Sequence, residues 1–163
     1  MRRIQAVQFR ERVEIARGDL QAGDARSKRS SPPVSATFYH AGHVLGAAMI
    51  LLDFGTLRVL YTGDWTGSED RHLMAADFPV GTALPDVIIG ESTTGVRVLE
   101  SRQARERRFC QSVESIVARR GRCLLPSSAV GRAQELLLIL DELWSANPRL
   151  RDVPLLYCSR QSK

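Results

Sequence analysis

The chain has 163 residues, 44% of them hydrophobic and 25% charged, which are the proportions of a globular protein with an ordinary core. It contains no apolar run of the roughly 18 residues that suggest a membrane span, and its first 15 residues hold no apolar stretch of the secretory kind, so we expect a cytosolic or nuclear protein. The net charge of +5 comes mostly from residues 1–30, and the rest of the chain gives little electrostatic argument for nucleic-acid binding.

The first half of the chain predicts a series of strands. Residues 4–15 carry imperfectly alternating apolar side chains, which indicates a first strand. Residues 17–33 are rich in Gly, Asp, Ser, Arg and Pro and predict a loop. We interpret its basic part, "RSKRSSPP", as a solvated loop. The alternative is a short basic targeting signal or a phosphate contact.

Four further strand-like segments follow this loop, and they are "VSATFYHA", "GAAMILLDF", "LRVLYTGD" and "DVIIGES". The continuous apolar run "GAAMILLDF" is typical of a strand buried on both faces. Only Gly55 and Thr56 separate it from the next segment, which predicts a hairpin.

Helical periodicity appears after Gly95. Residues 100–120 place apolar side chains at helical spacing, and Gly121 is a natural stop. A second helix is predicted between Val130 and Trp144, ended by Asn147-Pro148. The short runs "RCLLP" and "VPLLYCS" are predicted strands. Helices alternating with short apolar strands favour parallel βαβ units, hence an α/β fold.

The three cysteines are Cys110, Cys123 and Cys158. Because their number is odd and no CxxC pair occurs, they predict neither a disulfide framework nor a thiolate zinc site. We expect Cys110 and Cys123 to be buried thiols, given their apolar surroundings.

Two residues near strand ends suggest chemistry. His43 stands in "FYHAGHVLGA", and Asp64 stands in "VLYTGDWTG". A histidine before a buried strand is more often structural than a ligand. However, imidazole and carboxylate both suit Zn²⁺, and the predicted hairpin between Gly46 and Gly63 has its two ends side by side. We therefore expect His43 and Asp64 to converge, and a two-metal site is able to activate water for phosphodiester cleavage.

Four segments in this order resemble the metallo-β-lactamase/β-CASP nucleases: "YHAGHVLGAAM", "LLYTGDWTGSEDRHLMAA", "DVIIGEST" and "GRAQELLLILDELW". The resemblance implies a partial metallo-β-lactamase αββα sandwich (residues 1–95, with a loop insertion at 16–35) running into the start of a Rossmann-like β-CASP domain (residues 96–163). The α/β class thus includes an α+β, lactamase-like half.

The resemblance also implies roles for three residues. His43 matches the single histidine ligand of the "GHxLGA" motif, and Asp64 matches the carboxylate that bridges two zinc ions. Glu91, in "GEST", matches an acidic catalytic residue that orients a histidine thought to protonate the leaving oxygen. His40 and His72 match no ligand. We interpret them as structural residues, or as residues that contact the metal ligands without binding the metal themselves.

The branch that the motifs resemble acts on RNA, in pre-mRNA 3′-end cleavage and polyadenylation. This implies a nuclear protein with pre-mRNA and other cleavage factor subunits as partners. The family's His-x-His-x-Asp-His motif is absent, so we expect a middle fragment of such a nuclease that is inactive alone. The alternatives are a non-catalytic scaffold subunit or decayed paralogue on the same fold, and, more weakly, a small-molecule hydrolase.

Basic residues of the second half present a choice. Arginines of the helix at 100–120 are able to contact RNA phosphates, but glutamates lie within helical reach of several, and a solvated face laced with ion pairs is favoured. Arg132 and Gln134 stand at the start of the next helix, where a helix N-terminus attracts anions. We consider them candidate RNA-binding residues.

Overall fold

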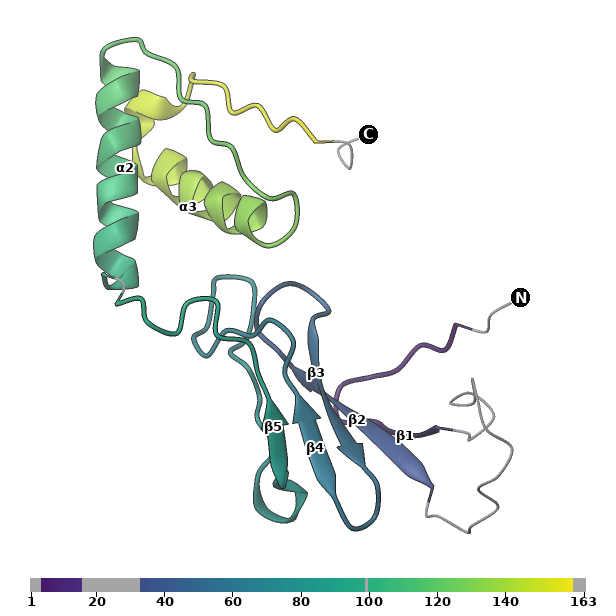
Figure 1. Ribbon diagram of the computed structural model, residues 1–163. Helices are drawn as coiled ribbons and strands as arrows, with labels where there is room; N and C mark the ends of the chain where they lie inside the picture. The colour runs from purple at the N-terminus through teal and green to yellow at the C-terminus, as the bar shows by residue number, and fades with distance from the viewer. Residues whose placement is uncertain (1–3, 16–32, 99, 160–163) are drawn as a thin grey trace. The chain divides into compact units, whose positions relative to one another are not determined.

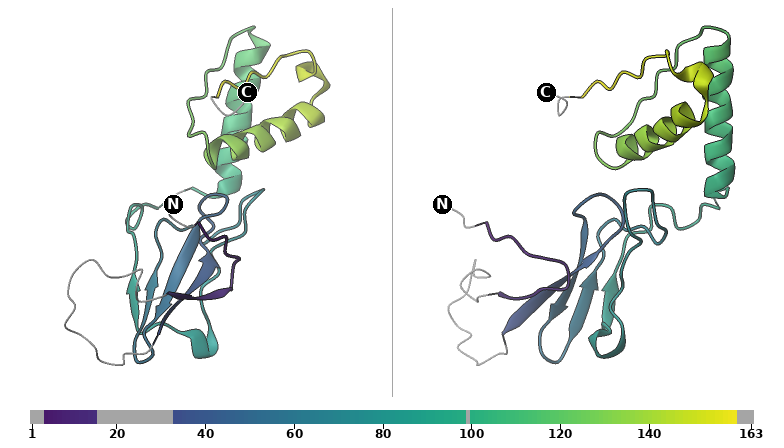
Figure 2. Two further views of the ribbon diagram at one scale, coloured as in Figure 1. Left: turned by 90° about the vertical axis from the view of Figure 1, so that its right-hand side faces the viewer. Right: turned by 180° about the vertical axis from the view of Figure 1, so that it is seen from behind.

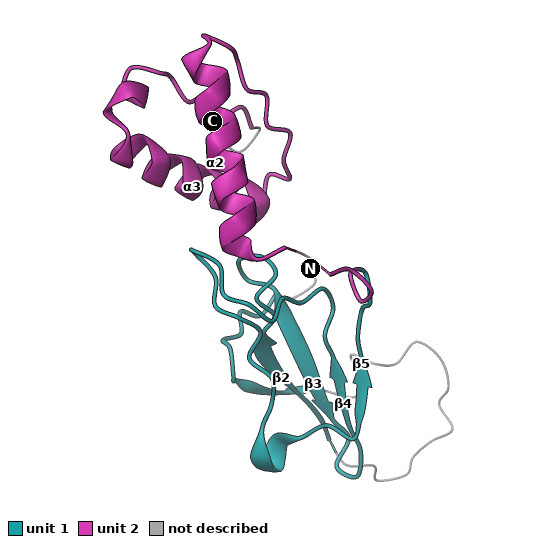
Figure 3. Cartoon of the chain, turned by 90° about the vertical axis from the view of Figure 1, so that its left-hand side faces the viewer, with its two compact units in different colours: residues 1–93 teal, residues 94–163 magenta. Residues whose placement is uncertain are grey.

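The computed structural model describes residues 4–15, 33–98 and 100–159 (Figure 1). The chain divides into two compact units, Met1–Thr93 and Thr94–Lys163 (Figure 3). Their assignment to a lactamase-like and a β-CASP domain stays a prediction. The predicted loop, apart from Pro33, and the last four residues lie outside the described part of the chain. No helix in the described part is long and apolar enough to cross a membrane.

The first unit is built on one five-stranded sheet whose order follows the sequence, β1-β2-β3-β4-β5. Successive strands pair antiparallel until β4 and β5, which pair parallel. The strands are β1 Arg12–Ile15, β2 Val34–His40, β3 Ala48–Asp53, β4 Arg58–Tyr61 and β5 Val87–Ile89, with the short 3-10 turn η1 Gly81–Ala83 between the last two. All five predicted strands of this half are confirmed, and the proposed insertion reaches two residues too far, because β2 already begins at Val34.

The first strand is shorter than the predicted 4–15, because the chain turns at Arg10. This residue has a φ of 65°, and its backbone N–H donates to the carbonyl of Phe38 at 2.6 Å. Its guanidinium makes hydrogen bonds of 2.7–2.9 Å to both carboxylate oxygens of Asp77. These contacts fix the segment before β1 against the sheet instead of continuing the strand.

The predicted hairpin joins β3 to β4. The N–H of Phe54 donates to the carbonyl of Leu57 at 2.9 Å, and Gly55 takes a φ of 87°. The Asp53 carboxylate accepts from the N–H of Gly55 at 2.8 Å. Asp53 and Gly55 thus give the tight turn its acceptor and its left-handed residue.

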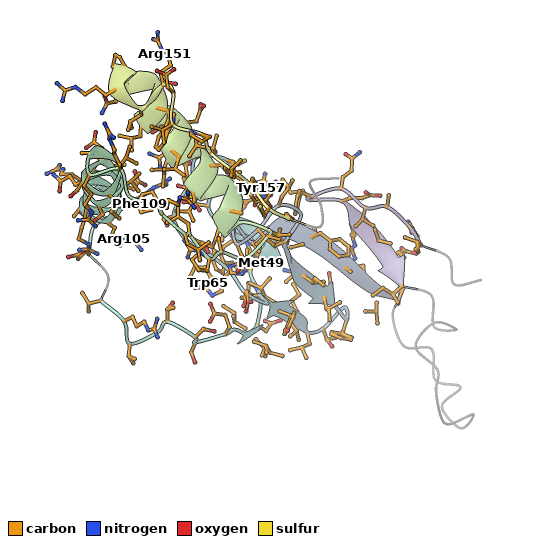
Figure 4. The ribbon with its side chains drawn as sticks, turned by 90° about the horizontal axis from the view of Figure 1, so that it is seen from above. Met49, Trp65, Arg105, Phe109, Arg151 and Tyr157 are labelled. Carbon is orange, nitrogen blue, oxygen red and sulfur yellow. The ribbon has the colours of Figure 1, made fainter. Side chains whose placement is uncertain are left out.

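The core of the first unit lies on one face of the sheet and consists of Tyr39, Ala41, Met49, Leu51 and Leu60, with Ala47, Ala76 and Ala83 packed against it. Met49, labelled in Figure 4, is fully buried. The expectation that β3 is buried on both faces is only half right. Ile50 and Leu52 alternate with Met49 and Leu51 and are partly exposed.

The second unit contains two helices, α2 Arg102–Ala118 and α3 Arg132–Ala146, and the 3-10 turn η2 Pro148–Leu150 (Figure 2). Both predicted helices are confirmed. Arg102 pairs with Glu106 on its own helix at 2.6 Å and with the buried Glu135 of α3. Asn147 Nδ2 donates to Glu114 at 3.0 Å, so polar contacts join the helices at two places.

Helix α2 ends close to Gly121, as predicted, but a different residue adopts the left-handed conformation that ends it. Arg120 takes the left-handed conformation, with a φ of 59°. The N–H groups of Arg120 and Gly121 donate to the carbonyls of Val117 and Ile116, each at 2.8 Å, which is a Schellman motif. Glycine is needed at 121 for space, because a Cβ there would lie 2.8 Å from the Ile116 side chain.

The two strands predicted in the second half are wrong for the described residues. Residues 122–126 and 153–159 form no strand, and the second unit shows no βαβ unit in its described part. Leu124 and Leu156 are 89% and 86% exposed. A strand exists only when another strand accepts its backbone hydrogen bonds, and none lies beside these segments. Cys123 is also exposed and Cys110 only half-buried, against expectation.

Candidate metal and catalytic site

The direction of three strands brings the predicted site residues to one edge of the sheet. β4 and β5 are parallel, and β2 runs the same way because it is two antiparallel steps from β4. The carboxyl ends of all three strands therefore meet at the same edge. His43 follows β2, Asp64 follows β4 and Glu91 follows β5.

His43 and Asp64 converge at this edge. The Nε2 atom of His43 lies 3.7 Å from Oδ2 of Asp64, and both side chains are accessible, at 45% and 67% exposed. The predicted convergence across the hairpin is therefore present. Neither side chain is buried in the core, so both are accessible to a ligand.

The small residues before His43 have a steric reason. Gly42 is buried, with a φ of 70°, and a Cβ at this position would lie only 2.6 Å from the carbonyl oxygen of Thr66. Next to it, Ala41 accepts from the N–H of Thr66 at 2.8 Å and donates to Ala47 at 3.1 Å. The loop that carries His43 is thus clamped between β3 and the segment after Asp64, which fixes the imidazole relative to the carboxylate.

The turn that carries Asp64 is fixed by Thr62. The Thr62 N–H donates to the carbonyl of Ile89 at 3.0 Å, which extends the pairing of β4 with β5. Thr62 is only 2% exposed, and its hydroxyl donates to the Gly63 carbonyl at 2.8 Å. Gly63 takes a φ of 55°. A glycine suits this left-handed turn, which aims the following Asp64 out of the sheet edge.

Glu91 is held by its own loop. Its Oε2 accepts from the backbone N–H of Thr93 at 2.5 Å. The hydroxyl and the amide of Thr93 lower the pKa of Glu91 below its usual value, partial desolvation opposes them, and the charge of His43 adds a smaller lowering.

A pocket of about 380 Å³ opens between these loops and is lined by Tyr61, Gly63, Asp64, Ile89, Gly90 and Glu91. Sequence reasoning did not single out Tyr61, Ile89 or Gly90. Tyr61 and Ile89 are register partners at the ends of the two parallel strands. A signal was present, since a parallel pairing of "RVLY" with "VII" would have predicted that the residues on either side of both strand ends share one pocket.

The pair His43–Asp64 fits a metal ion. Two ligands on tetrahedral Zn²⁺, at bonds of about 2.0–2.2 Å, stand about 3.3–3.6 Å apart, within a few tenths of the observed 3.7 Å. Imidazole nitrogen and carboxylate oxygen are also an ordinary zinc donor set. Within the described ranges, no group of three or more His, Cys, Asp or Glu side chains is placed to hold an ion, so His43 and Asp64 would supply only part of a coordination sphere.

Other predicted residues lie elsewhere. The His40 ring stacks on Phe9, with centroids 3.5 Å apart, which is a packing role. Arg132 is exposed at the first turn of α3, and Gln134 Nε2 donates to the carbonyl of Ala129 at 3.0 Å. Both belong to the second unit. Arg102 and Arg108 of α2 (on which Figure 4 labels Arg105) pair with glutamates, which agrees with a solvated face laced with ion pairs.

An imidazole and a carboxylate at metal-binding separation, with a second carboxylate lining the same pocket, form the kind of site found in metal-dependent hydrolases. No protein-family profile matches the chain. It is 54% identical to cleavage and polyadenylation specificity factor 73 of Drosophila melanogaster over 93% of this chain and 22% of that protein. It is 46% identical to endoribonuclease YSH1 of Mycosarcoma maydis, over 99% of this chain and 16% of that protein.

A third relative, cleavage and polyadenylation specificity factor subunit 3 of Dictyostelium discoideum, is 51% identical over 85% of the chain and 18% of its own length. The chain therefore belongs to the family of cleavage and polyadenylation specificity factor subunit 3 and endoribonuclease YSH1, as its motifs predicted. It spans about a fifth of the length of the curated relatives it matches. The finer lactamase and β-CASP assignment stays a prediction.

Proposed function

We propose that this chain is the segment of a zinc-dependent RNA endonuclease of pre-mRNA 3′-end cleavage and polyadenylation that supplies part of the metal site and one catalytic carboxylate. The observation that carries the proposal is the meeting of His43, Asp64 and Glu91 at one sheet edge. Relatives at 46–54% identity are named as endoribonuclease YSH1 or as subunits of the cleavage and polyadenylation specificity factor, which supports the reaction and the pathway.

His43 and Asp64 would hold the metal, through Nε2 and a carboxylate oxygen. When bound, zinc would supply Lewis-acid stabilisation of the phosphodiester and an activated water. The clamped loop of His43 and the rigid turn before Asp64 keep the two donors near their binding separation without the metal. Binding of the metal would therefore require little rearrangement of the chain.

Glu91 lines the pocket with an ionised carboxylate, since its pKa is lowered. In this state it accepts hydrogen bonds and does not donate a proton. We therefore assign it the orientation of a neighbouring proton donor instead of proton donation itself. By resemblance to the metallo-β-lactamase/β-CASP nucleases, the proposed leaving-group acid is a histidine that this chain does not contribute.

The proposed substrate is pre-mRNA, in the nucleus and together with other cleavage factor subunits. Arg132 and Gln134 remain proposed RNA contacts, because both stand at the first turn of α3, where backbone N–H groups favour a phosphate. Arg132 is exposed and therefore accessible to a strand of RNA.

The test is zinc-dependent cleavage of a polyadenylation-site RNA by the complete protein that contains this segment. We expect cleavage by the wild type, no cleavage by Asp64→Ala, and unchanged cleavage by the control Asp141→Ala, whose carboxylate is exposed on α3 in the other unit. An inactive wild type that still enters the cleavage complex would instead support a non-catalytic scaffold. Equal cleavage by wild type and Asp64→Ala would overturn the site.

A further inference from the structure

Two apolar side chains form one wall of the pocket that Asp64 and Glu91 also line. Tyr61 ends β4 and Ile89 ends β5, and as register partners they stand on the same face of the sheet. Both are about half exposed, at 51% and 52%. The pocket therefore has an apolar wall on the strands and carboxylates on the loops that follow them.

The ring of Tyr61 extends toward the loop of Asp64. A Cβ on Gly63 would lie 3.8 Å from Cε1 of Tyr61, the carbon next to the one that carries the hydroxyl. The far end of the ring therefore lies beside Gly63, one residue before the proposed metal ligand. A larger side chain at residue 63 would contact this end of the ring, and glycine leaves it open.

These features suit a single unpaired nucleotide. The pocket volume of about 380 Å³ is at the small end of the range of about 300–1,000 Å³ for ligand pockets. Unpaired RNA bases are recognised by stacking on aromatic side chains, and Tyr61 offers such a ring. A phosphate would be repelled by the carboxylates of Asp64 and Glu91 until a metal neutralises them, so we expect nucleotide binding to require the metal.

We propose that Tyr61 and Ile89 form a base subsite, in which the Tyr61 ring stacks on the base of one unpaired nucleotide whose phosphate lies toward Asp64. This rests on the proposed function, which supplies RNA as the ligand. In an RNA substrate, the stacked base would belong to a nucleotide adjoining the cleaved bond. Tyr61 would then act on the binding of RNA and not on the metal.

The first experiment follows the tyrosines of the chain by ¹⁹F NMR after labelling with 3-fluorotyrosine. The chain has three tyrosines, whose signals are assigned by replacing each with Phe. The probes are adenosine 5′-monophosphate and ribose 5-phosphate, which lacks the base, both with Zn²⁺ in excess. Tyr39 in the core and Tyr157, 40% exposed in the second unit, are internal controls.

We expect adenosine 5′-monophosphate to move the Tyr61 signal alone, and ribose 5-phosphate to leave it in place. A Tyr61 signal that does not move with the nucleotide would overturn the proposal. Equal movement of the Tyr157 signal, or equal movement of the Tyr61 signal with ribose 5-phosphate, would overturn it as well.

The second experiment measures the affinity of variants for adenosine 5′-monophosphate by equilibrium dialysis with Zn²⁺. Tyr61→Leu removes the ring, and we expect affinity to fall about 5- to 100-fold, the range for one aromatic–base stack. Tyr61→Phe keeps the ring and is expected to bind as the wild type does, as is the matched control Tyr157→Leu. Wild-type affinity in Tyr61→Leu, or a loss as large in Tyr61→Phe or in Tyr157→Leu, contradicts the subsite. Because no RNA is cleaved in either experiment, a failure of the proposed catalysis leaves both outcomes unchanged.

Discussion

Nε2 of His43 lies 3.7 Å from Oδ2 of Asp64, although a complete hairpin separates the two residues in the chain. The strands between them carry the core residues Met49, Leu51 and Leu60, so burial of apolar surface fixes the frame on which the pair stands. Since the frame does not depend on the metal, each site residue can be tested by substitution without rebuilding the fold.

The first prediction concerns metal affinity of the chain by itself. Complete structural zinc sites supply about 10–16 kcal/mol, and two of four ligands would give roughly half of that, a dissociation constant between about 1 µM and 0.2 mM. Isothermal titration calorimetry with Zn²⁺ measures it. We expect weak binding that His43→Ala and Asp64→Ala each reduce further. Tight one-to-one binding, abolished by His43→Ala, would show that the described residues miss other ligands.

The second prediction ranks two carboxylates in the complete enzyme. Asp64→Ala removes a proposed metal ligand, so we expect cleavage to fall to background. Glu91→Gln keeps the size of the side chain and changes only its charge and hydrogen bonding, so we expect a loss of about 10–100-fold, the range for groups that orient other site residues. Single-turnover cleavage of an RNA substrate measures both. A Glu91→Gln loss as complete as that of Asp64→Ala would assign Glu91 a more direct role.

The 163-residue chain extends this comparison, since it holds two expected ligands and no leaving-group acid. We expect no zinc-dependent RNA cleavage from it under the same conditions. Robust cleavage by the chain alone would contradict the view that the site is completed from elsewhere.

The third prediction concerns the loop of His43. Gly42→Ala places a methyl group 2.6 Å from the Thr66 carbonyl oxygen and 2.8 Å from the Ala76 nitrogen, at a φ of 70°. Strain and overpacking together predict a loss of about 2–5 kcal/mol of unfolding free energy. Gly46→Ala is the matched control, because its φ is 83° and nothing lies within 4 Å of its Cβ.

For Gly46→Ala only the strain term remains, about 1–2 kcal/mol. Urea unfolding followed by circular dichroism measures both variants. Equal losses at the two glycines would mean that close approach of the backbone at Gly42 contributes nothing.

The fourth prediction concerns the exposed edge of the sheet. β5 is exposed at all three of its residues, and Ile88 in particular is 60% exposed. An apolar edge strand pairs readily with another chain. We expect Ile88→Lys to raise the concentration at which the chain begins to aggregate, with a stability change within about 0.5 kcal/mol.

Ile4→Lys adds the same charge at a residue that is 98% exposed and outside any strand. Static light scattering over a concentration series compares the two. If both variants delay aggregation equally, net charge and not the β5 edge is the cause.

The fifth prediction is a pH dependence. The Thr93 hydroxyl and amide lower the pKa of Glu91 from its ordinary 4.5. A lowered carboxyl pKa stabilises the folded state above the ordinary value, and this contribution is lost as the pH falls through the folded pKa. Unfolding free energies of wild type and Glu91→Gln are therefore expected to differ at pH 7 and to converge below pH 4.5. A difference that stays constant over this range would mean that the Glu91 charge has no part in stability.

The sequence by itself determined the local elements and the membership of the family. The run "GAAMILLDFGTLRVLY" contains both strands and the turn of the hairpin, because apolar runs, a glycine between them and the Asp53 acceptor are all local signals. The helices 102–118 and 132–146 were likewise predictable from their apolar spacing and from Asn147-Pro148. His43, Asp64 and Glu91 were recognisable because each stands in a short motif after a strand.

Only the tertiary structure decided which strands exist and which residues meet. "RCLLP" and "VPLLYCS" carry the same apolar signal as β5, yet only β5 forms, because β4 lies beside it and accepts its hydrogen bonds. Likewise, Arg120 ends α2 although its sequence favours no left-handed turn. The pocket needed the parallel register of Tyr61 with Ile89, which sets the loops of Asp64 and Glu91 side by side. Pairing between distant strands depends on the geometry of both partners at once, and no single stretch of sequence contains it.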